Sequence, residues 1–320
     1  MSNKEIYRKT LVFSIRRLLF DIIALALLGG LCAIGFFLTD KLTDNGLIGL
    51  LIGLVVGIII IAVVSRFISY MYKAGQIAMM TRALTENELP DNVVAEGKKV
   101  VKERFLTVAI YFAATSAIKS LFNALSNAIS GVGRSVGGDA GGAVGSAIGI
   151  VINTIVAYLC DCCLGWVFFR TTRNAFKAIC EGAVIFFKHG KTFARNMGRI
   201  FGLGALSLVL IAGPLTGVFY LFFSQYSATF QILAAEFAES ESNGLRALLS
   251  NPVTLAVVVS FIAAVIIWAI IHSVFIRPFV LVGVLRNYLE SGKQDIPEES
   301  SFSMLKGKSS KFDKLEKKLA

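Results

Sequence analysis

The chain has 320 residues, of which 55% are hydrophobic and only 17% are charged. This composition excludes an ordinary soluble domain and predicts an all-α integral membrane protein. The formal net charge of +11 does not indicate nucleic-acid binding, because the lysines and arginines flank the apolar runs instead of forming one basic patch. Such flanking charges orient a membrane protein and favour anionic lipids at the cytosolic face.

The apolar runs predict six membrane spans, because about 20 mainly apolar residues are needed to cross the hydrocarbon core as a helix. The run after the basic residues at the start of the chain is too long for a signal peptide and lacks a cleavage site, so we interpret it as a span. The predicted spans are residues 18–38, 46–69, 105–130, 143–169, 200–223 and 253–276.

Basic residues predict the orientation of the spans. Residues 1–17, the linker after the second span and the linker after the fourth span are all rich in lysine and arginine, whereas the loop after the fifth span is acidic. Positively charged segments stay on the cytosolic side. We therefore predict a multi-pass protein of the plasma membrane with both termini in the cytosol.

The third predicted span, 105–130, is the least regular, because Lys119 interrupts its apolar run. One alternative is a short, tilted span followed by an interfacial helix. The apolar face of that helix would consist of Ile118, Leu121, Phe122, Leu125 and Ile129. Both versions place the following loop outside.

The six spans group as three outward hairpins within one membrane domain, each followed by a cytosolic and partly amphipathic segment. We divide the chain into hairpin 1 with its linker (1–104), hairpin 2 with its linker (105–199), hairpin 3 (200–292) and a basic tail (293–320). A weak likeness between RALTENELP at 82–90 and RNYLESGKQDIP at 286–297 suggests a threefold internal repeat. Chance similarity is the alternative. The chain lacks the proline motif of mitochondrial carriers, which excludes that family.

Glycines recur at four-residue spacing in two of the spans, and this spacing lets helix backbones approach closely. We favour packing within the chain over a homo-oligomer. The predicted packing residues are Gly49, Gly53, Gly57, Gly141, Gly145 and Gly149.

Polar residues within the spans are the candidates for a solute or ion path, because ionisable groups at membrane depth are costly. Asp161 lies about 12 Å from the inner end of its span at about 1.5 Å per residue. Asn153 continues the same helix face toward Gly145 and Gly149. A cation or proton site at Asn153 and Asp161 is one hypothesis. The other is that Asp161 pairs with a neighbouring arginine or caps backbone groups.

His272 and Arg277 lie at the inner end of the sixth span, where Pro278 is expected to end or kink the helix. Either they contribute to the path, or Arg277 only reaches toward lipid phosphates. The cysteines around Asp161 lack the spacing of a zinc module, and no catalytic motif is present. We therefore expect no enzyme activity, metal or cofactor.

Residues 160–200 carry three motifs in order: CDCC at 160–163, RNAF at 173–176 and RNMGRI at 195–200. This order resembles the choline transporter-like family, which has a cysteine cluster, an RNA-aromatic motif and a later RNxxR motif. The resemblance covers about an eighth of the chain, and the spacing of the motifs differs. It implies a membrane transporter with organic-cation substrates.

Two functions follow as hypotheses. The first is a transporter or channel for a small solute or cation, with Asn153, Asp161, His272 and Arg277 near the path. The second is a membrane scaffold or assembly factor that binds partners or lipids through its cytosolic linkers.

Overall fold

The computed structural model describes residues 1–43, 46–105, 116, 119–120, 141–189, 200–238 and 250–305. These residues form helices without any strand, which confirms the all-α prediction for the described part of the chain. They belong to two units, Met1–Ala194 with Pro278–Ala320, and Arg195–Arg277. We describe each unit by itself.

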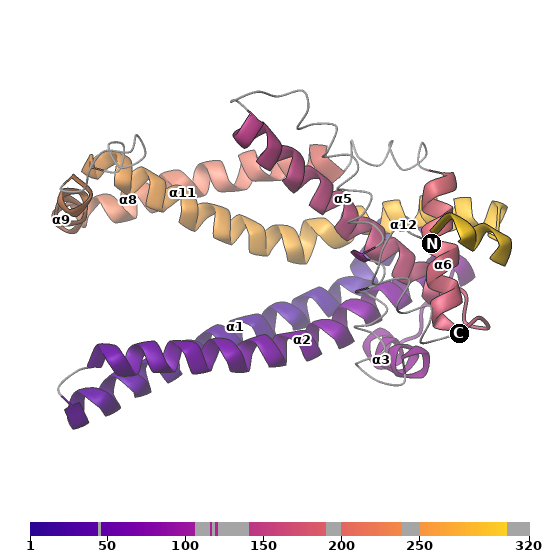
Figure 1. The fold of residues 1–320 in the computed structure, drawn as a ribbon, viewed down its shortest axis with the longest axis horizontal. Helices are drawn as coiled ribbons and strands as arrows, with labels where there is room; N and C mark the ends of the chain where they lie inside the picture. Colours follow the sequence, from indigo (N-terminus) through magenta and orange to yellow (C-terminus); the bar gives the residue numbers. More distant parts are fainter. Residues whose placement is uncertain are drawn as a thin grey trace. The chain divides into compact units, whose positions relative to one another are not determined.

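Unit 1 begins with two long antiparallel helices, α1 (Asn3–Thr43) and α2 (Gly46–Glu86), which lie side by side (Figure 1). Each has 41 residues and is therefore about 60 Å long, roughly twice the thickness of the hydrocarbon core. Only about half of each helix can lie in a membrane. In each helix the most apolar residues lie in the half next to residues 44–45.

The apolar halves of α1 and α2 contact each other through glycine. A Cβ atom at Gly49 would overlap the backbone of Gly35, and one at Gly53 would overlap the backbone of Leu31. The aliphatic side chains around this seam point outward, and Ile34 and Ile59 are both exposed. Backbones this close gain van der Waals contact that lipid does not oppose.

The other halves of α1 and α2 are packed on several sides. Ile6 and Phe13 of α1 are fully buried, and Gln76 of α2 is buried between them. The Gln76 Nε2 atom donates to the Thr10 carbonyl at 3.1 Å and lies 3.0 Å from Ser14 Oγ. Buried apolar groups with satisfied polar neighbours are typical of a core that excludes water.

The remaining helices of unit 1 complete this core. They are α3 (Val93–Arg104), α5 (Gly141–Phe169), α6 (Ala175–Lys188), α12 (Arg277–Gln294, in unit 1 from Pro278) and the 3-10 helix η3 (Glu299–Leu305). We use the name inner module for the following set: the halves of α1 and α2 away from residues 44–45 (their inner halves), α3, residues 154–169 of α5, α6, α12 and η3.

Helix α6 lies at the centre of the inner module. All its residues from Ala178 to Phe186 are buried, between α5, α12 and η3. A Cβ atom at Gly292 of α12 would lie 2.7 Å from Ile185, and Phe302 of η3 packs on Cys180. This linker was predicted to be partly amphipathic, and the structure adds that the middle of its helix is buried.

Unit 2 contains a helix from Ile200 to Ser224, the short helix α9 (Ser227–Ala238) and α11 (Pro252–Ile271). The first of these includes a π-helical turn, η1 (Leu208–Ala212), and ends as α8 (Gly213–Ser224). A second π turn, η2 (His272–Ile276), follows α11. Helices α8 and α11 lie side by side (Figure 1).

Each π turn lies just before a proline. A proline has no N–H and clashes with the carbonyl four residues earlier, which is Leu210 for Pro214 and Val274 for Pro278. The wider π turn accommodates this mismatch. Of the two expected effects of Pro278, an end of the helix is excluded, since helical residues continue from Pro252 to Gln294.

Three helices in the described part of the chain are long and apolar enough to cross a membrane, namely Asn3–Leu42, Ile200–Ser224 and Pro252–Gln294. Ile48–Ile61 and Thr154–Phe169 are shorter apolar helices. The third predicted span lies outside the described residues except for Ser116, Lys119 and Ser120. Six spans and the threefold repeat stay predictions.

Candidate functional site

The residues predicted to line a path fall into different parts of the structure. Asp161 lies in α5 of unit 1, whereas His272 and Arg277 lie in unit 2. Asn153 is also in α5, but its side chain lies outside the described residues. Neither unit by itself brings together Asp161 and His272.

Asp161 forms an ion pair with Lys73 of α2, with 2.6 Å between Lys73 Nζ and Asp161 Oδ1. The Asp161 side chain is only 4% exposed, whereas that of Lys73 is 34% exposed. An ion pair was one of the alternatives predicted for Asp161, but the partner is Lys73 and not an arginine. The lysine is seven residues beyond Arg66 on the basic side of the second predicted span, a position that gave no indication of its partner.

The position of Lys73 also locates the pair relative to the apolar run of α2. Lys73 is about 10 Å along the helix beyond Arg66, where the basic linker begins. Asp161 contacts this linker segment, and its neighbours Cys162 and Cys163 are fully buried. The pair therefore belongs to the inner module and not to a lipid-exposed segment of α5.

The ion pair limits the chemistry of Asp161. A buried carboxylate without a counter-charge is strongly unfavourable, and the Lys73 ammonium supplies that charge. A cation or proton that bound Asp161 would have to displace Lys73 first. Because Lys73 is partly exposed, its ammonium can move toward water while Asp161 stays in place.

A second buried carboxylate, Glu181 of α6, organises a larger cluster. Its side chain is 2% exposed and accepts hydrogen bonds from Trp166 Nε1 at 3.0 Å and Arg170 Nε at 2.9 Å. Arg173 Nε lies 3.7 Å from the same carboxylate. We call Trp166, Arg170, Arg173 and Glu181 the Glu181 cluster.

The Glu181 cluster was not predicted from the sequence. The available signal was a single acid within the uncharged run AICEGAVIFF at 178–187, because such a residue needs a buried partner. The partners are Trp166 of α5 and Arg170 just after it, and only the turn between α5 and α6 brings them within reach of Glu181.

Arg104 joins this cluster to α3 through the backbone. Its Nη1 donates to the carbonyls of Thr171 and Arg173 at 3.1 and 2.6 Å, and its Nη2 donates to that of Arg170 at 2.9 Å. Carbonyls just beyond a helix carry partial negative charge, which suits a guanidinium. Desolvation lowers the pKa of Arg104, and the Glu181 carboxylate partly opposes that shift.

The RNAF motif has a structural role at the start of α6. The Asn174 side chain accepts a hydrogen bond from the Phe176 N–H at 2.8 Å and so caps the helix. Arg173 contacts Glu299 of η3 at 3.4 Å as well as Glu181. The later motif at 195–199 lies outside the described residues.

In unit 2, His272 lies beside Trp268, with 5.2 Å between the ring centroids. Trp268 Nε1 donates to Ser207 Oγ at 3.0 Å, and Ser207 in turn donates to the Gly204 carbonyl at 2.8 Å. Polar side chains joined in this way satisfy each other within an apolar hairpin. These side chains connect α11 to the helix that begins at Ile200, close in sequence to the π turns η1 and η2.

The cysteines are all free thiols. Cys163 Sγ lies 3.6 Å from the Ile179 carbonyl, and a Cβ atom at Gly182 would lie 2.7 Å from the same sulfur. Within the described ranges, no three histidine, cysteine or acidic residues are grouped so that they could hold a metal ion. Cys163 therefore takes part in the packing of α5 on α6.

The six glycines predicted to pack against other helices lie in α2 and α5. Gly49 and Gly53 lie against α1 as described above, and Gly57 lies against Leu28. The surroundings of Gly141, Gly145 and Gly149 lie outside the described residues, although all three are part of α5.

No protein-family model, curated protein or solved structure matches this chain.

Proposed function

We propose that this protein is an integral membrane scaffold, which holds a rigid helical module at the cytosolic surface of the membrane for a partner to bind. The support comes from the packing of the segments that lie between the predicted spans. Residues 67–104, 170–189 and 278–305 do not form separate linkers, but pack into the one inner module. A module of this kind offers a fixed surface instead of a moving one.

The single observation that carries the proposal is the ion pair between Lys73 and Asp161. Asp161 is the strongest candidate for an ion-binding group in the sequence, yet it is buried and paired at 2.6 Å. A carboxylate held this way stabilises the junction of α2 and α5. It has no open position for a substrate while Lys73 is in contact.

The exposed surface of the module suggests how it is held at the membrane. Helix α3 buries Val94 and Val101 and exposes Lys99 and Lys102 on its other side. The start of α1 also exposes basic side chains, among them Lys9. Such charges favour anionic lipid headgroups at the inner surface.

A transporter or channel for a small solute or cation is the second candidate. The unequal exposure of the pair, 4% for Asp161 and 34% for Lys73, favours it. If Lys73 swings away, Asp161 becomes a single buried acid that can take up a proton or cation, as acids in transporters do.

The test measures flux and stability in the same preparations. Purified protein is reconstituted in vesicles, and proton and cation flux is compared with that of protein-free vesicles. The scaffold predicts equal flux, together with recovery of a stoichiometric partner from native membranes. Flux through the unaltered protein that Asp161→Asn abolishes without unfolding the protein would establish transport instead.

The two single substitutions also distinguish a structural pair from a transport site. Lys73→Met removes the positive charge that contacts the buried carboxylate and is expected to cost about 3 kcal/mol of unfolding free energy. Asp161→Asn leaves only a lysine that can reach water, so we expect about 1 kcal/mol. Thermal unfolding in nanodiscs gives the comparison. Equal costs, or a larger cost for Asp161→Asn, would contradict the structural assignment.

A further inference from the structure

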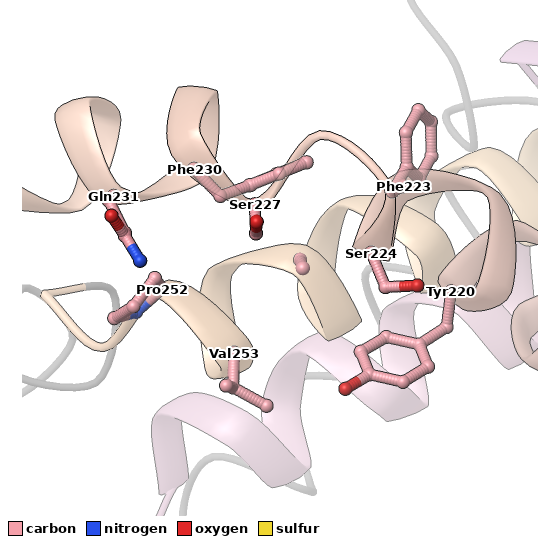
Figure 2. A pocket seen from close by; sticks show the side chains of 9 residues that line it. Tyr220, Phe223, Ser224, Ser227, Phe230, Gln231, Pro252 and Val253 are labelled. Atoms are coloured by element: carbon pink, nitrogen blue, oxygen red, sulfur yellow. The ribbon is translucent and has the colours of Figure 1, made fainter.

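Unit 2 contains a cavity of about 190 Å³ between α8, α9 and α11 (Figure 2). Its floor is formed by Phe230 and Ala256, which are both buried. Its rim includes exposed side chains, and Val253 there is 57% exposed. The cavity is therefore open to the surroundings at one end and closed at the other.

The lining has a clear chemical character. None of its residues is charged, and the rings of Tyr220, Phe223 and Phe230 provide much of the wall. Ser227 and Gln231, both labelled in Figure 2, add a hydroxyl and an amide to the lining. An uncharged apolar floor with hydrogen-bonding groups at the rim suits a neutral hydrocarbon chain that carries an oxygen group at one end.

The position of the cavity identifies the source of such a chain. The candidate spans Ile200–Ser224 and Pro252–Gln294 end and begin at the cavity, so its opening lies where the hydrocarbon core gives way to the interface. Tyrosines such as Tyr220 favour this level of a bilayer. Membrane lipids carry their ester groups there and their acyl chains directly below.

We propose that this cavity binds the end of one acyl chain of a membrane lipid, with the ester group of the lipid near Ser227 and Gln231. The volume admits part of a chain and not a whole lipid, since a cavity of roughly 150 Å³ holds one benzene molecule. The floor formed by Phe230 and Ala256 offers water no hydrogen-bond partner, so a hydrocarbon chain suits that end of the cavity better. The absence of charged residues from the lining predicts binding that is independent of the headgroup.

The experiment uses the full chain in nanodiscs of phosphatidylcholine that carries a photoreactive diazirine in its acyl chain. After irradiation, mass spectrometry locates the labelled residues. Labelling of peptides that contain Phe230 or Ala256 is expected, and it should be the same when phosphatidylglycerol carries the diazirine. In a separate sample, a short diazirine-labelled alcohol added in water tests whether the cavity binds a small soluble ligand instead.

Two variants of α9 provide the control. Ser227→Phe fills the opening from an exposed position, and labelling of the cavity should fall at least fivefold. Thr229→Phe adds the same ring at an exposed position that does not line the cavity, so labelling should stay within twofold of the original. Equal labelling in the two variants would overturn the proposal, as would labelling by the soluble alcohol but not by the lipid.

Discussion

The two halves of the α1–α2 hairpin differ in how the same pair of helices is held together. In the half beyond Arg17 and before Arg66, the helices touch through glycine backbones, and large aliphatic side chains point away from the seam. In the inner half, aromatic and aliphatic side chains are buried, and Gln76 is hydrogen-bonded to α1. Lipid gives no hydrophobic drive between helices, whereas water does. A change from lipid to water around the helices would produce this change in contacts along their length.

The largest expected effect is on the inner module. Glu181→Ala would leave Arg170 without its buried acceptor and Trp166 Nε1 without a partner, so we expect a loss of about 3 kcal/mol in unfolding free energy. Thermal unfolding in nanodiscs measures it. The matched change Glu290→Ala, at an exposed position of α12, should stay within about 0.5 kcal/mol. Similar losses for the two variants would mean that the Glu181 cluster does not hold the module together.

An intermediate effect is expected in the apolar half of the hairpin. Gly53→Val would place a side chain against the Leu31 backbone and force the helices apart, at a cost of about 2 kcal/mol. Gly29→Val adds the same side chain where nothing lies within 4 Å, so it isolates the effect of contact from that of helix propensity. Spin labels on α1 and α2 report the separation. An unchanged separation in Gly53→Val would show that the glycine contacts do not set the distance between α1 and α2 in this half.

The smallest effect concerns the edge of the inner module, where Lys177 Nζ donates to Glu299 Oε1 at 2.9 Å. The hydrogen bond and the charge of Lys177 lower the pKa of Glu299. A lowered pKa means that the contact stabilises η3 fully above the ordinary glutamate pKa of about 4.3 and is lost as the pH falls through the lower folded value. Hydrogen exchange of η3 should rise over that range. In Glu299→Gln it should be raised at neutral pH and should no longer depend on this titration.

The sequence was sufficient to predict the helical class and the position of the longest apolar runs, because both depend on local composition. It did not predict that α6 is a core helix, since burial on every side depends on α12 and η3, which lie about a hundred residues later. The same limit applies to the candidate site. Asp161 stood out as an acid in an apolar run, but its partner Lys73 is 88 residues away, in a segment that reads as an ordinary basic linker.

Prolines set a different limit on prediction. Pro214 and Pro278 both suggest the end or a kink of a helix, and in each case a π turn carries the helix past the proline. A π turn depends on one extra residue within the turn and has no distinct composition. Its position could therefore not be derived from the pattern of apolar residues.

The contact between the start of α1 and α12 has a consequence for the order of assembly during synthesis. Arg286 Nε donates to Asn3 Oδ1 at 2.7 Å, across 283 positions of the chain. The α1–α2 hairpin can enter the membrane and close its glycine seam as soon as it leaves the ribosome. The face of α1 that meets α12 must wait until almost the whole chain has been made. During that interval this face is open to chaperones, proteases and other nascent chains, so the speed of translation through the last third of the chain determines how long the growing protein is vulnerable.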